Sequence, residues 1–233
     1  MSEPAAWIVI PARMGSTRLP GKPLAPVRGV PMIGRVVERA LRVSGVDRVV
    51  VATDHAAIAD VAEAFGATAV LTGPARSGTH RVAEAVAAIG WRGAVVNLQG
   101  DQPLVDPASV GRVVARLAAG AAIATLAAPY LGDPTDPHRV KVIVAGERAL
   151  WFSRAAIPVG GPWWQHVGVY GFAPGALAAA VAAPPGGSAG EDLEQLAWLE
   201  AGLEIAVDLV DDAPPGVDTP EQLAIVEARL DRL

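Results

Sequence analysis

The chain has 233 residues, a net charge of −5 at pH 7 and 52% hydrophobic residues, a composition typical of a globular protein with a substantial core. It contains no cysteine, which excludes thiol catalysis, cysteine-ligated zinc, iron–sulfur clusters and disulfides. An acidic chain lacks the broad basic face that nonspecific nucleic-acid binding requires. Because we find neither a secretory signal nor an apolar run long enough to span a membrane, we expect a cytoplasmic protein that binds neither nucleic acid nor membrane.

Short β-branched runs alternate with alanine-rich helical windows over the first 130 residues. This alternation is typical of strand–helix–strand units on a mostly parallel sheet. The pattern predicts strands at residues 7–10, 49–52, 68–71, 94–98 and 122–127, and helices at residues 31–43, 56–65, 79–89 and 107–117. Five such strands are enough for a Rossmann-like α/β sheet flanked by helices.

The regular alternation weakens from residue 133 onward. Three predicted strands follow one another without helices between them, at residues 140–144, 150–153 and 166–172, which indicates an antiparallel flap or a mixed-sheet extension. Further helices are expected at residues 174–181, 191–201 and 220–230, a loop at 183–190 and a last strand at 203–207. We find no internal repeat, and we interpret residues 1–233 as a single domain.

The loop after the first predicted strand, residues 11–23, concentrates cations, hydroxyl groups and glycines. Arg13, Arg18 and Lys22 lie there with Ser16, at the strand end where open α/β sheets bind ligands. Backbone N–H groups and cations together bind a triphosphate well, although the spacing fits neither a P-loop nor a dinucleotide-binding motif. A basic surface loop without a ligand remains the alternative.

Lysine is rare in this chain, which has only Lys22 and Lys141 against seventeen arginines. A position that keeps lysine where arginine is otherwise used indicates a need for a compact point charge. For Lys141 the sequence leaves this explanation and chance composition equally open.

Two aspartates follow predicted strands or begin predicted helices. Asp101 ends the buried strand 94–98, beside the first loop, and is well placed to bind magnesium. A helix cap is not its role, because Asp106 already caps the next helix. Asp218 precedes the capping box of Thr219, so it serves either the helix dipole or the metal, and spacing alone leaves both open.

Several other polar residues are weak signals when each is taken alone. Ser77, Gly78 and Arg81 lie at a helix start, and Arg154, Tyr170 and Gln195 lie in the second half of the chain. His166 is as consistent with a structural histidine as with a ligand, and Glu191, Asp192 and Glu194 are also explained as the acidic first turn of a helix.

Eight short segments occur in order along nearly the whole chain: Ile10-Pro-Ala-Arg13 with Thr17-Arg18-Leu19-Pro20-Gly21-Lys22-Pro23, Ala52-Thr53-Asp54, Ser77-Gly78-Thr79 with Arg81, Asn97-Leu98-Gln99-Gly100-Asp101, Phe152-Ser153-Arg154, His166-Val-Gly-Val-Tyr170-Gly, Leu193-Glu194-Gln195-Leu196 and Gly216-Val-Asp218-Thr-Pro220. Together they resemble the 3-deoxy-manno-octulosonate cytidylyltransferase family, the CMP-Kdo synthetases. Eight ordered motifs are far more specific than any one of them.

The resemblance implies a magnesium-dependent transfer of CMP from CTP to the anomeric C2 hydroxyl of a 3-deoxy sugar acid, with release of pyrophosphate. It implies a Rossmann-like nucleotidyltransferase fold with an antiparallel dimerisation and sugar-binding extension, in which residues 1–130 form the nucleotide half and residues 131–233 the sugar-binding and dimerisation half. A homodimer is expected because the stretch 140–172 carries Trp151, Trp163 and Trp164.

Residue roles follow from matching motif positions. The catalytic residues would be Arg13, Lys22 and Asp101, with Asp101 and Asp218 as the magnesium ligands. The resemblance places these residues around CTP: Arg13, Gly15, Ser16, Arg18, Lys22, Ser77, Gly78, Arg81 and Gln99. It places Arg154, His166, Tyr170, Glu194 and Gln195 around the sugar acid, the cationic members meeting its carboxylate.

The chain departs from the family pattern at three places. Gln102 stands where the family usually has glutamate, and Met14-Gly15 replaces an aromatic–alanine pair. The stretch 158–166 is short and uncharged where the family has a longer charged insertion beside the sugar site. The acceptor is therefore open among Kdo, 8-amino-Kdo, a nonulosonate and another acid, and a sugar-nucleotide-using glycosyltransferase or a silent nucleotide-binding protein are the alternative functions.

Overall fold

The computed structural model describes residues 6–16, 18–184 and 191–232. Three features named above lie outside these ranges: the start of the chain, Thr17 of the first loop and residues 185–190 of the loop predicted at 183–190.

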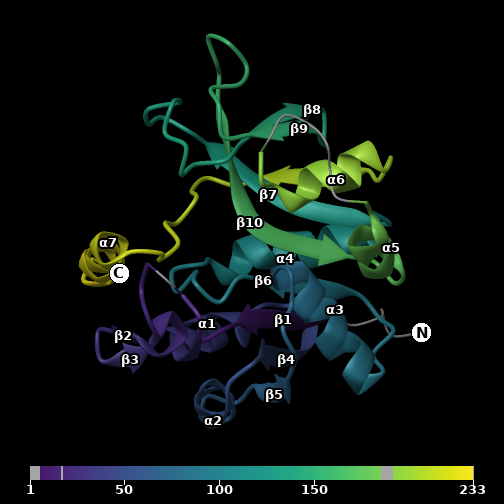
Figure 1. Ribbon diagram of the computed structural model, residues 1–233. Coiled ribbons are helices and arrows are strands. Elements are labelled where there is room, and N and C mark those ends of the chain that lie inside the picture. Colours follow the sequence, from purple (N-terminus) through teal and green to yellow (C-terminus); the bar gives the residue numbers. More distant parts are fainter. Residues whose placement is uncertain (1–5, 17, 185–190, 233) are drawn as a thin grey trace.

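Nine strands of the described residues form one mixed sheet in the order β5-β4-β1-β6-β10-β7-β11-β9-β8 (Figure 1). The strands β5, β4, β1 and β6 run parallel to one another, as does β11 with β7. Their bounds are β1 Ala6–Ala12, β4 Val46–Thr53, β5 Thr68–Leu71, β6 Val95–Leu98, β7 Ile123–Pro129, β8 Lys141–Ala145, β9 Arg148–Ser153, β10 Trp164–Phe172 and β11 Ile205–Leu209. The predicted α/β fold with a mostly parallel first half is confirmed.

The strand β10 differs from the expectation, because it lies inside the sheet and not in an extension beside it. It pairs antiparallel with both β6 and β7 and so joins the two halves of the chain in one sheet. The preceding hairpin of β8 and β9 lets the chain return antiparallel without a helical crossover. Gly171 makes room for α4, since a Cβ there would lie 2.5 Å from Val113 Cγ1.

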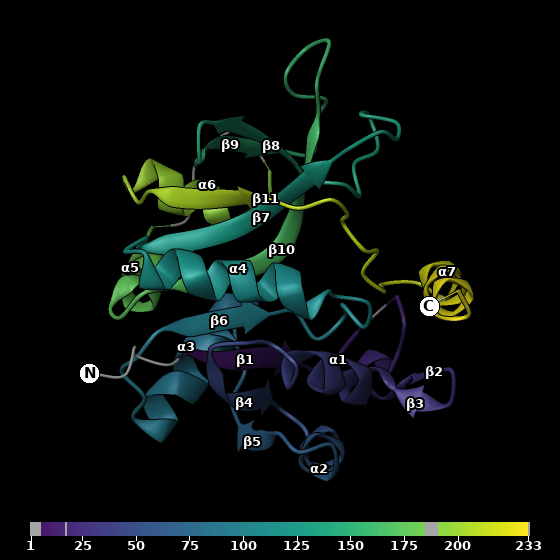
Figure 2. The same ribbon diagram turned by 180° about the vertical axis from the view of Figure 1, so that it is seen from behind.

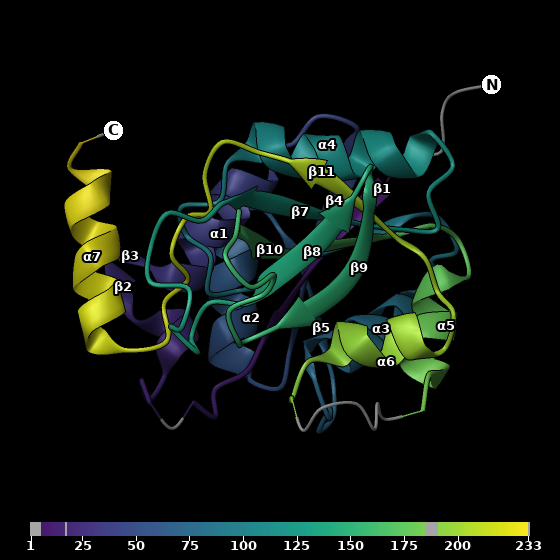
Figure 3. The ribbon, with the colours of Figure 1, turned by 90° about the horizontal axis from the view of Figure 1, so that it is seen from above.

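Helices cover both faces of the sheet (Figures 2 and 3). Alternate residues of β1 divide between the two layers, with Ile8 and Ile10 in one hydrophobic cluster and Trp7 and Val9 in the other. The first cluster includes side chains of α1 Met32–Ala40, α2 Ala56–Ala64 and α4 Pro107–Ala118, and the second those of α3 Gly78–Ile89, α5 Ala176–Ala182 and α6 Glu194–Glu200.

A third, smaller cluster holds the last helix, α7 Pro220–Leu230, away from the main layers (Figure 1). Val226 of α7 packs there with Val27, Met32 and Val217 beside the small hairpin of β2 Pro26–Val27 and β3 Val30–Pro31. Thr219 and Gln222 form the predicted capping box at the start of α7. An extended segment therefore leads from β11 back to the first loop.

Three local features differ from the prediction. The helix expected at 191–201 begins only at Glu194, because the Glu191 carboxylate accepts hydrogen bonds from Ser153 and the backbone of Arg154 instead of from its own helix. The β2–β3 hairpin and the short 3-10 helix Lys22–Leu24 were not predicted. The helix predicted at 31–43 spans only Met32–Ala40, because the β2–β3 hairpin includes Pro31.

Candidate active site

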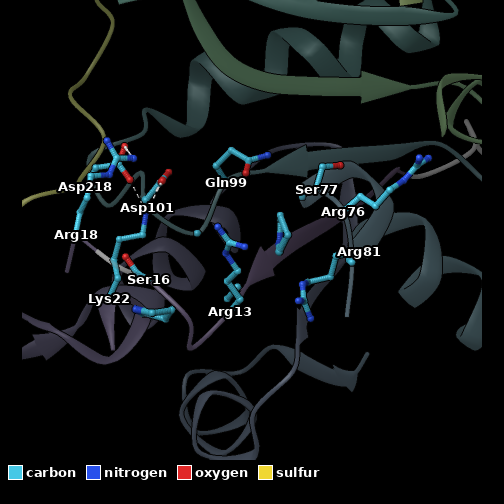
Figure 4. A pocket seen from close by; sticks show the side chains of 16 residues that line it. Arg13, Ser16, Arg18, Lys22, Arg76, Ser77, Arg81, Gln99, Asp101 and Asp218 are labelled. Atoms are coloured by element: carbon cyan, nitrogen blue, oxygen red, sulfur yellow. Dashed lines mark hydrogen bonds and ion pairs between the residues drawn. The ribbon is translucent and has the colours of Figure 1, made fainter. Parts of the chain in front are cut away.

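A pocket of about 300 Å³ opens at the carboxyl ends of β1 and β6 (Figure 4). Ligands of open α/β sheets bind at this edge. Of the residues predicted around CTP and magnesium, all but Gly15 line the pocket: Arg13, Ser16, Arg18, Lys22, Ser77, Gly78, Arg81, Gln99, Asp101 and Asp218. Folding therefore brings the loop after β1, the start of α3, the end of β6 and the segment before α7 to one place.

The loop after β1 turns sharply before it reaches Lys22. Gly21 has a φ of 66°, a left-handed conformation that glycine adopts without the strain of a Cβ, and it caps the 3-10 helix Lys22–Leu24. The turn directs the Lys22 side chain into the pocket beside Asp101 (Figure 4). Arg13 is exposed at the pocket wall, and Ser16 faces the same opening.

The Lys22 ammonium lies between the two aspartates. Its Nζ is 2.8 Å from Asp101 Oδ2 and 2.9 Å from Asp218 Oδ1, and only 17% of the side chain is exposed. Burial by itself lowers the pKa of Lys22, but the two carboxylates more than offset it, and the pKa is raised. Lys22 is therefore fully protonated at neutral pH.

Asp218 has a second cationic partner, because Arg18 Nη2 lies 3.0 Å from Asp218 Oδ2. Burial acts to raise the pKa of Asp218, yet the hydrogen bond and charge of Lys22, with those of Arg18, lower it overall. The principal contacts of the Asp218 side chain are therefore with the pocket cations and not with the start of the helix, whose dipole the sequence offered as an alternative.

The backbone beside Asp101 holds Asp218 in place. The N–H of Val217 donates to the carbonyl of Asp101 at 2.9 Å, and Val217 is fully buried in the third cluster. Both carboxylates can therefore reach one point, the position of the Lys22 ammonium.

The donor set fits a magnesium ion. Magnesium is commonly bound through one or two carboxylates, with water and substrate phosphates completing the coordination. Asp101 and Asp218 supply two carboxylates that converge on one cation. Within the described ranges no cluster of three or more His, Asp or Glu side chains suits a metal, so the protein alone supplies an incomplete shell.

The opposite wall of the pocket is built from the start of α3 and the end of β6. Ser77 is the N-cap of α3, and its side chain accepts from the backbone N–H of His80. Gly78 lies directly below the Gln99 carboxamide, because a Cβ at Gly78 would be 3.0 Å from Gln99 Oε1 and 3.3 Å from Pro11 Cγ. A side chain at position 78 would therefore push Gln99 out of place.

Arg81 is held by residues to which the sequence analysis gave no role. It is only 4% exposed, and its guanidinium donates to Asp54 Oδ2 at 3.1 Å and to Thr72 Oγ1 at 2.5 Å. Asp54 also accepts from the backbone N–H of Met14, so one carboxylate connects Arg81 to the first loop. The available signal was its place at the carboxyl end of β4, within the segment Ala52-Thr53-Asp54.

The residues expected around the sugar acid do not line this pocket. Glu194 lies nearest to it: its carboxylate accepts from the Ser77 hydroxyl and, at 2.9 Å, from Thr79 Oγ1. Tyr170 is buried with an unpaired hydroxyl among the described residues, and Gln195 is 5% exposed. The Tyr170 ring lies 5.1 Å from that of His166.

His166 is neutral in the folded protein, so among the residues predicted around the sugar acid it is an uncharged ring. Burial lowers its pKa to about 3. The Thr125 hydroxyl donates to the Val169 carbonyl at 2.7 Å, so its oxygen accepts from His166 Nε2 at 2.9 Å. Among the predicted sugar-acid residues, the permanent positive charge belongs to Arg154.

The backbone of Arg154 is held by hydrogen bonds at both its N–H and its carbonyl. Its N–H donates to Glu191, and its carbonyl accepts from Lys141 Nζ at 2.5 Å. Lys141 is fully buried and also donates to the carbonyls of Asp136 and Arg139. The structure thus answers the question left open for Lys141, which fills a cage of three carbonyls that suits an ammonium.

The comparisons agree with this arrangement. A protein-family model described as cytidylyltransferase matches residues 7–171. The chain is 48% identical to a 3-deoxy-manno-octulosonate cytidylyltransferase of Rhodospirillum centenum, with 96% of this chain and 93% of the relative covered. It is 46% identical to the protein of the same name from Anaeromyxobacter sp. strain Fw109-5, with 96% of each covered.

Solved structures give the same result. A CMP:2-keto-3-deoxy-manno-octonic acid synthetase complexed with CTP superposes with a TM-score of 0.91 at 38% identity, over 98% of this chain and 99% of the other. A 4-diphosphocytidyl-2C-methyl-D-erythritol synthase from Anaerococcus prevotii has a TM-score of 0.69 at 14% identity over 98% of this chain and 96% of the other, a likeness of fold alone. The helices of the described residues include none that is long and apolar enough to cross a membrane. The chain belongs to the family of 3-deoxy-manno-octulosonate cytidylyltransferases and is an enzyme of the cytidylyltransferase class.

Proposed function

We propose that the enzyme transfers CMP from CTP to the anomeric C2 hydroxyl of Kdo, giving CMP-Kdo and pyrophosphate, in a magnesium-dependent reaction in the cytoplasm. The observation that carries the proposal is the convergence of Lys22, Asp101 and Asp218 within 2.9 Å in a pocket with four arginines, Arg13, Arg18, Arg76 and Arg81. Phosphoryl transfer depends mainly on positioning and charge neutralisation, which this arrangement supplies.

In this proposal the cations of the first loop bind the phosphates. Arg13, Arg18 and Lys22 surround the triphosphate, and Lys22 neutralises charge that develops on the α-phosphate. Ser16 and the wall of Ser77, Gly78, Arg81 and Gln99 hold the nucleoside and the adjoining phosphates. Gly15 does not line the pocket in the structure, so its part is limited to the shape of the loop.

The reaction forms one bond and breaks another. The C2 hydroxyl oxygen attacks the α-phosphorus, the bond from that phosphorus to the bridging oxygen breaks, and pyrophosphate leaves with the electron pair. Asp101 holds the proton released by the hydroxyl. Magnesium, held by Asp101 and Asp218, would neutralise phosphate charge and lower the pKa of the attacking hydroxyl.

In this proposal the sugar acid binds among the five residues predicted for it, next to the start of α3. Arg154 meets the carboxylate of the acid, and Glu194 and Gln195 meet its hydroxyls. His166 and Tyr170 form the aromatic wall, where His166 acts as a neutral ring. The contact between Glu194 and Ser77, a residue of the nucleotide pocket, supports this assignment.

The first experiment is magnesium-dependent pyrophosphate release from CTP with Kdo, 8-amino-8-deoxy-Kdo and N-acetylneuraminate in parallel. We expect release with Kdo, and loss of release in Asp101→Ala. Asp211→Ala is the matched control, because Asp211 is an exposed aspartate on the same segment as Asp218 and outside the pocket. Absence of release with every acid would overturn the proposal, and release with another acid alone would reassign the acceptor.

We also propose that the enzyme is a homodimer formed through the region 140–172 and its neighbours. The apolar side chains of Leu131, Leu150 and Val159 are 96%, 53% and 98% exposed, which supports a covered surface. Light scattering at micromolar concentration is expected to give twice the chain mass of 23.8 kDa. A monomeric mass would contradict the dimer.

A further inference from the structure

The first turn of the last helix, α7, makes hydrogen bonds that act on Asp218. The carboxamide oxygen of Gln222 accepts from the backbone N–H of Asp218 at 2.6 Å and from that of Thr219 at 3.2 Å. The first of these bonds is additional to the capping box, which joins only Thr219 and Gln222. Gln222 therefore holds the peptide group of a residue whose carboxylate faces Lys22 and Arg18 in the pocket (Figure 4).

The backbone at Asp218 is held from two directions. The N–H of the preceding residue, Val217, donates to the carbonyl of Asp101 at 2.9 Å, and the N–H of Asp218 itself donates to Gln222. An aspartate side chain has only two torsions, so the position of its carboxylate follows closely from its backbone. Gln222 does not line the pocket, and it therefore acts on the pocket only through another residue.

The other end of α7 is attached to the turn of the β2–β3 hairpin, beside which it lies in both side views (Figures 1 and 2). Glu227 Oε1 accepts from the backbone N–H of Arg28 at 2.8 Å, and the Arg28 guanidinium pairs with Asp231. The hairpin follows directly on the 3-10 helix that begins at Lys22. The helix α7 therefore bridges the segment that carries Asp218 and the loop that carries Lys22.

The conformation of Arg28 indicates that this attachment overrides a local preference. Arg28 and Gly29 are the two central residues of the hairpin turn, with φ of 48° and 75°. Positive φ at both positions is the pattern of a type I′ turn, whose first central residue is usually Asn, Asp or Gly. Within the described ranges Arg28 is the one non-glycine residue with a positive φ. Arginine is costly at this position of the turn, and its contacts with α7 offset the cost.

We infer that Gln222 and Arg28 are positioning residues for Asp218: the first fixes its backbone, and the second fixes α7 against the hairpin, so that the carboxylate stays in position to bind a cation. The inference rests on the proposed function in one respect, the binding of a divalent cation by Asp101 and Asp218. Neither positioning residue lines the pocket. Their effect is therefore on the affinity for the cation, and on catalysis only through that affinity.

The experiment measures Mn²⁺ binding in the absence of sugar acid, with and without CTP. Mn²⁺ takes the same oxygen ligands as Mg²⁺, and water proton relaxation distinguishes the protein-bound ion from the free ion and from free Mn–CTP. Gln222→Met keeps the length of the side chain and removes the acceptor. We expect the Mn²⁺ dissociation constant to rise about tenfold, the low end of what the loss of an outer partner of a metal ligand costs. Gln222→Glu keeps an acceptor and should retain the wild-type affinity.

A second variant, Arg28→Asn, separates positioning from general stability. Asparagine suits the first central position of a type I′ turn, so the hairpin should be at least as stable, but the ion pair with Asp231 is lost. We expect the urea midpoint to stay the same or rise while the Mn²⁺ dissociation constant rises about threefold, a small effect because the ion pair is exposed. A merely structural role would move the midpoint and the affinity for Mn²⁺ in the same direction.

The matched control is Asp106→Ala. Asp106 caps α4, where its carboxylate accepts from two backbone N–H groups, and it does not line the pocket. Loss of this cap should lower the urea midpoint and leave the Mn²⁺ dissociation constant unchanged. The control therefore shows what the loss of a helix cap does when no pocket residue is attached to it.

Three results would overturn the inference: a wild-type protein that binds no Mn²⁺, an unchanged affinity in Gln222→Met or in Arg28→Asn, or a loss of affinity in Gln222→Glu or Asp106→Ala equal to that in Gln222→Met. Failure of the proposed reaction is a different result. It would appear as absent pyrophosphate release by the wild type with every acid, while Mn²⁺ binding still reports on Asp218.

Discussion

Acidification should destabilise the folded protein through His166. Burial lowers the pKa of His166 to about 3 from its ordinary value of 6.5. Between these two pH values the unfolded chain binds a proton that the folded chain excludes, so stability falls as the pH is lowered from about 6.5 toward 3 and is fully present above that window. The ring lies at the edge of Phe152 and beside Tyr170, with no carboxylate among the causes of its shift.

The expected magnitude follows from the width of the window. At pH 5, roughly 1.5 pH units below 6.5, the histidine of the unfolded chain is protonated while that of the folded chain stays neutral. At 1.36 kcal/mol per pH unit, the free energy of unfolding is lower by about 2 kcal/mol. Urea unfolding of the wild type at pH 7.5 and pH 5, compared with His166→Gln, measures this difference. The glutamine amide can still donate to Thr125 but does not titrate.

The matched control is His138→Gln, because His138 is exposed and should keep the wild-type dependence on pH. Carboxylates contribute to the pH dependence of all three proteins and cancel in the comparison. If wild type and His166→Gln lost the same free energy of unfolding between pH 7.5 and pH 5, the argument for a half-buried neutral histidine would be wrong.

Three substitutions test the nucleotide pocket. Lys22→Met should lower kcat by about 10²–10³ at saturating CTP, measured as pyrophosphate release, and an unchanged kcat would refute the charge-neutralising role of this lysine. Gly78→Ala should raise the KM for CTP about tenfold with kcat largely kept, because the new Cβ displaces Gln99; an unaltered KM would mean that Gln99 moves freely. Asp54→Asn should lower the free energy of unfolding by about 1–3 kcal/mol in urea, since the guanidinium of the buried Arg81 loses its charged partner, and equal stability would show that Thr72 alone suffices.

Periodicity was sufficient to predict the parallel half of the fold. The strands β1, β4, β5 and β6 are short apolar runs between amphipathic helices, and both layers follow from the alternation of buried residues in β1. The position of β10 could not be predicted, because its insertion between β6 and β7 depends on partners far away in the chain. Only Gly171, a glycine inside a buried strand, marks a close approach of another element.

The nucleotide side of the site was predictable for the same physical reason. Arg13, Lys22 and Asp101 follow parallel strands or the loop after them, and the carboxyl ends of parallel strands lie at one edge. The supporting residues were not predictable. The contacts of Asp54 with Arg81, and of Thr79 with Asn97 and Glu194, join segments whose spatial relation the sequence does not encode locally.

The roles of His166 and Lys141 could not be determined from residue type alone. The sequence placed His166 among the residues around the sugar acid and left open whether Lys141 is needed as a compact point charge. In the fold burial lowers the pKa of His166, and its ring packs against Phe152 and Tyr170. The Lys141 ammonium donates its hydrogen bonds to backbone carbonyls, one of which belongs to Arg154. Arg154 keeps a permanent positive charge. Its Nη1 donates to the Pro137 carbonyl at 2.9 Å, and its own carbonyl accepts from Lys141.

Asp218 connects the stability of the smallest core cluster to the chemistry of the pocket. The aspartate reaches Lys22 only because Val217 is buried beside Met32 and Leu104 while its N–H binds the carbonyl of Asp101. Val226 of α7 completes the same cluster. Because Val226 of α7 belongs to the cluster that buries Val217, the packing of a helix at the edge of the fold helps to set the position of the Asp218 carboxylate in the pocket.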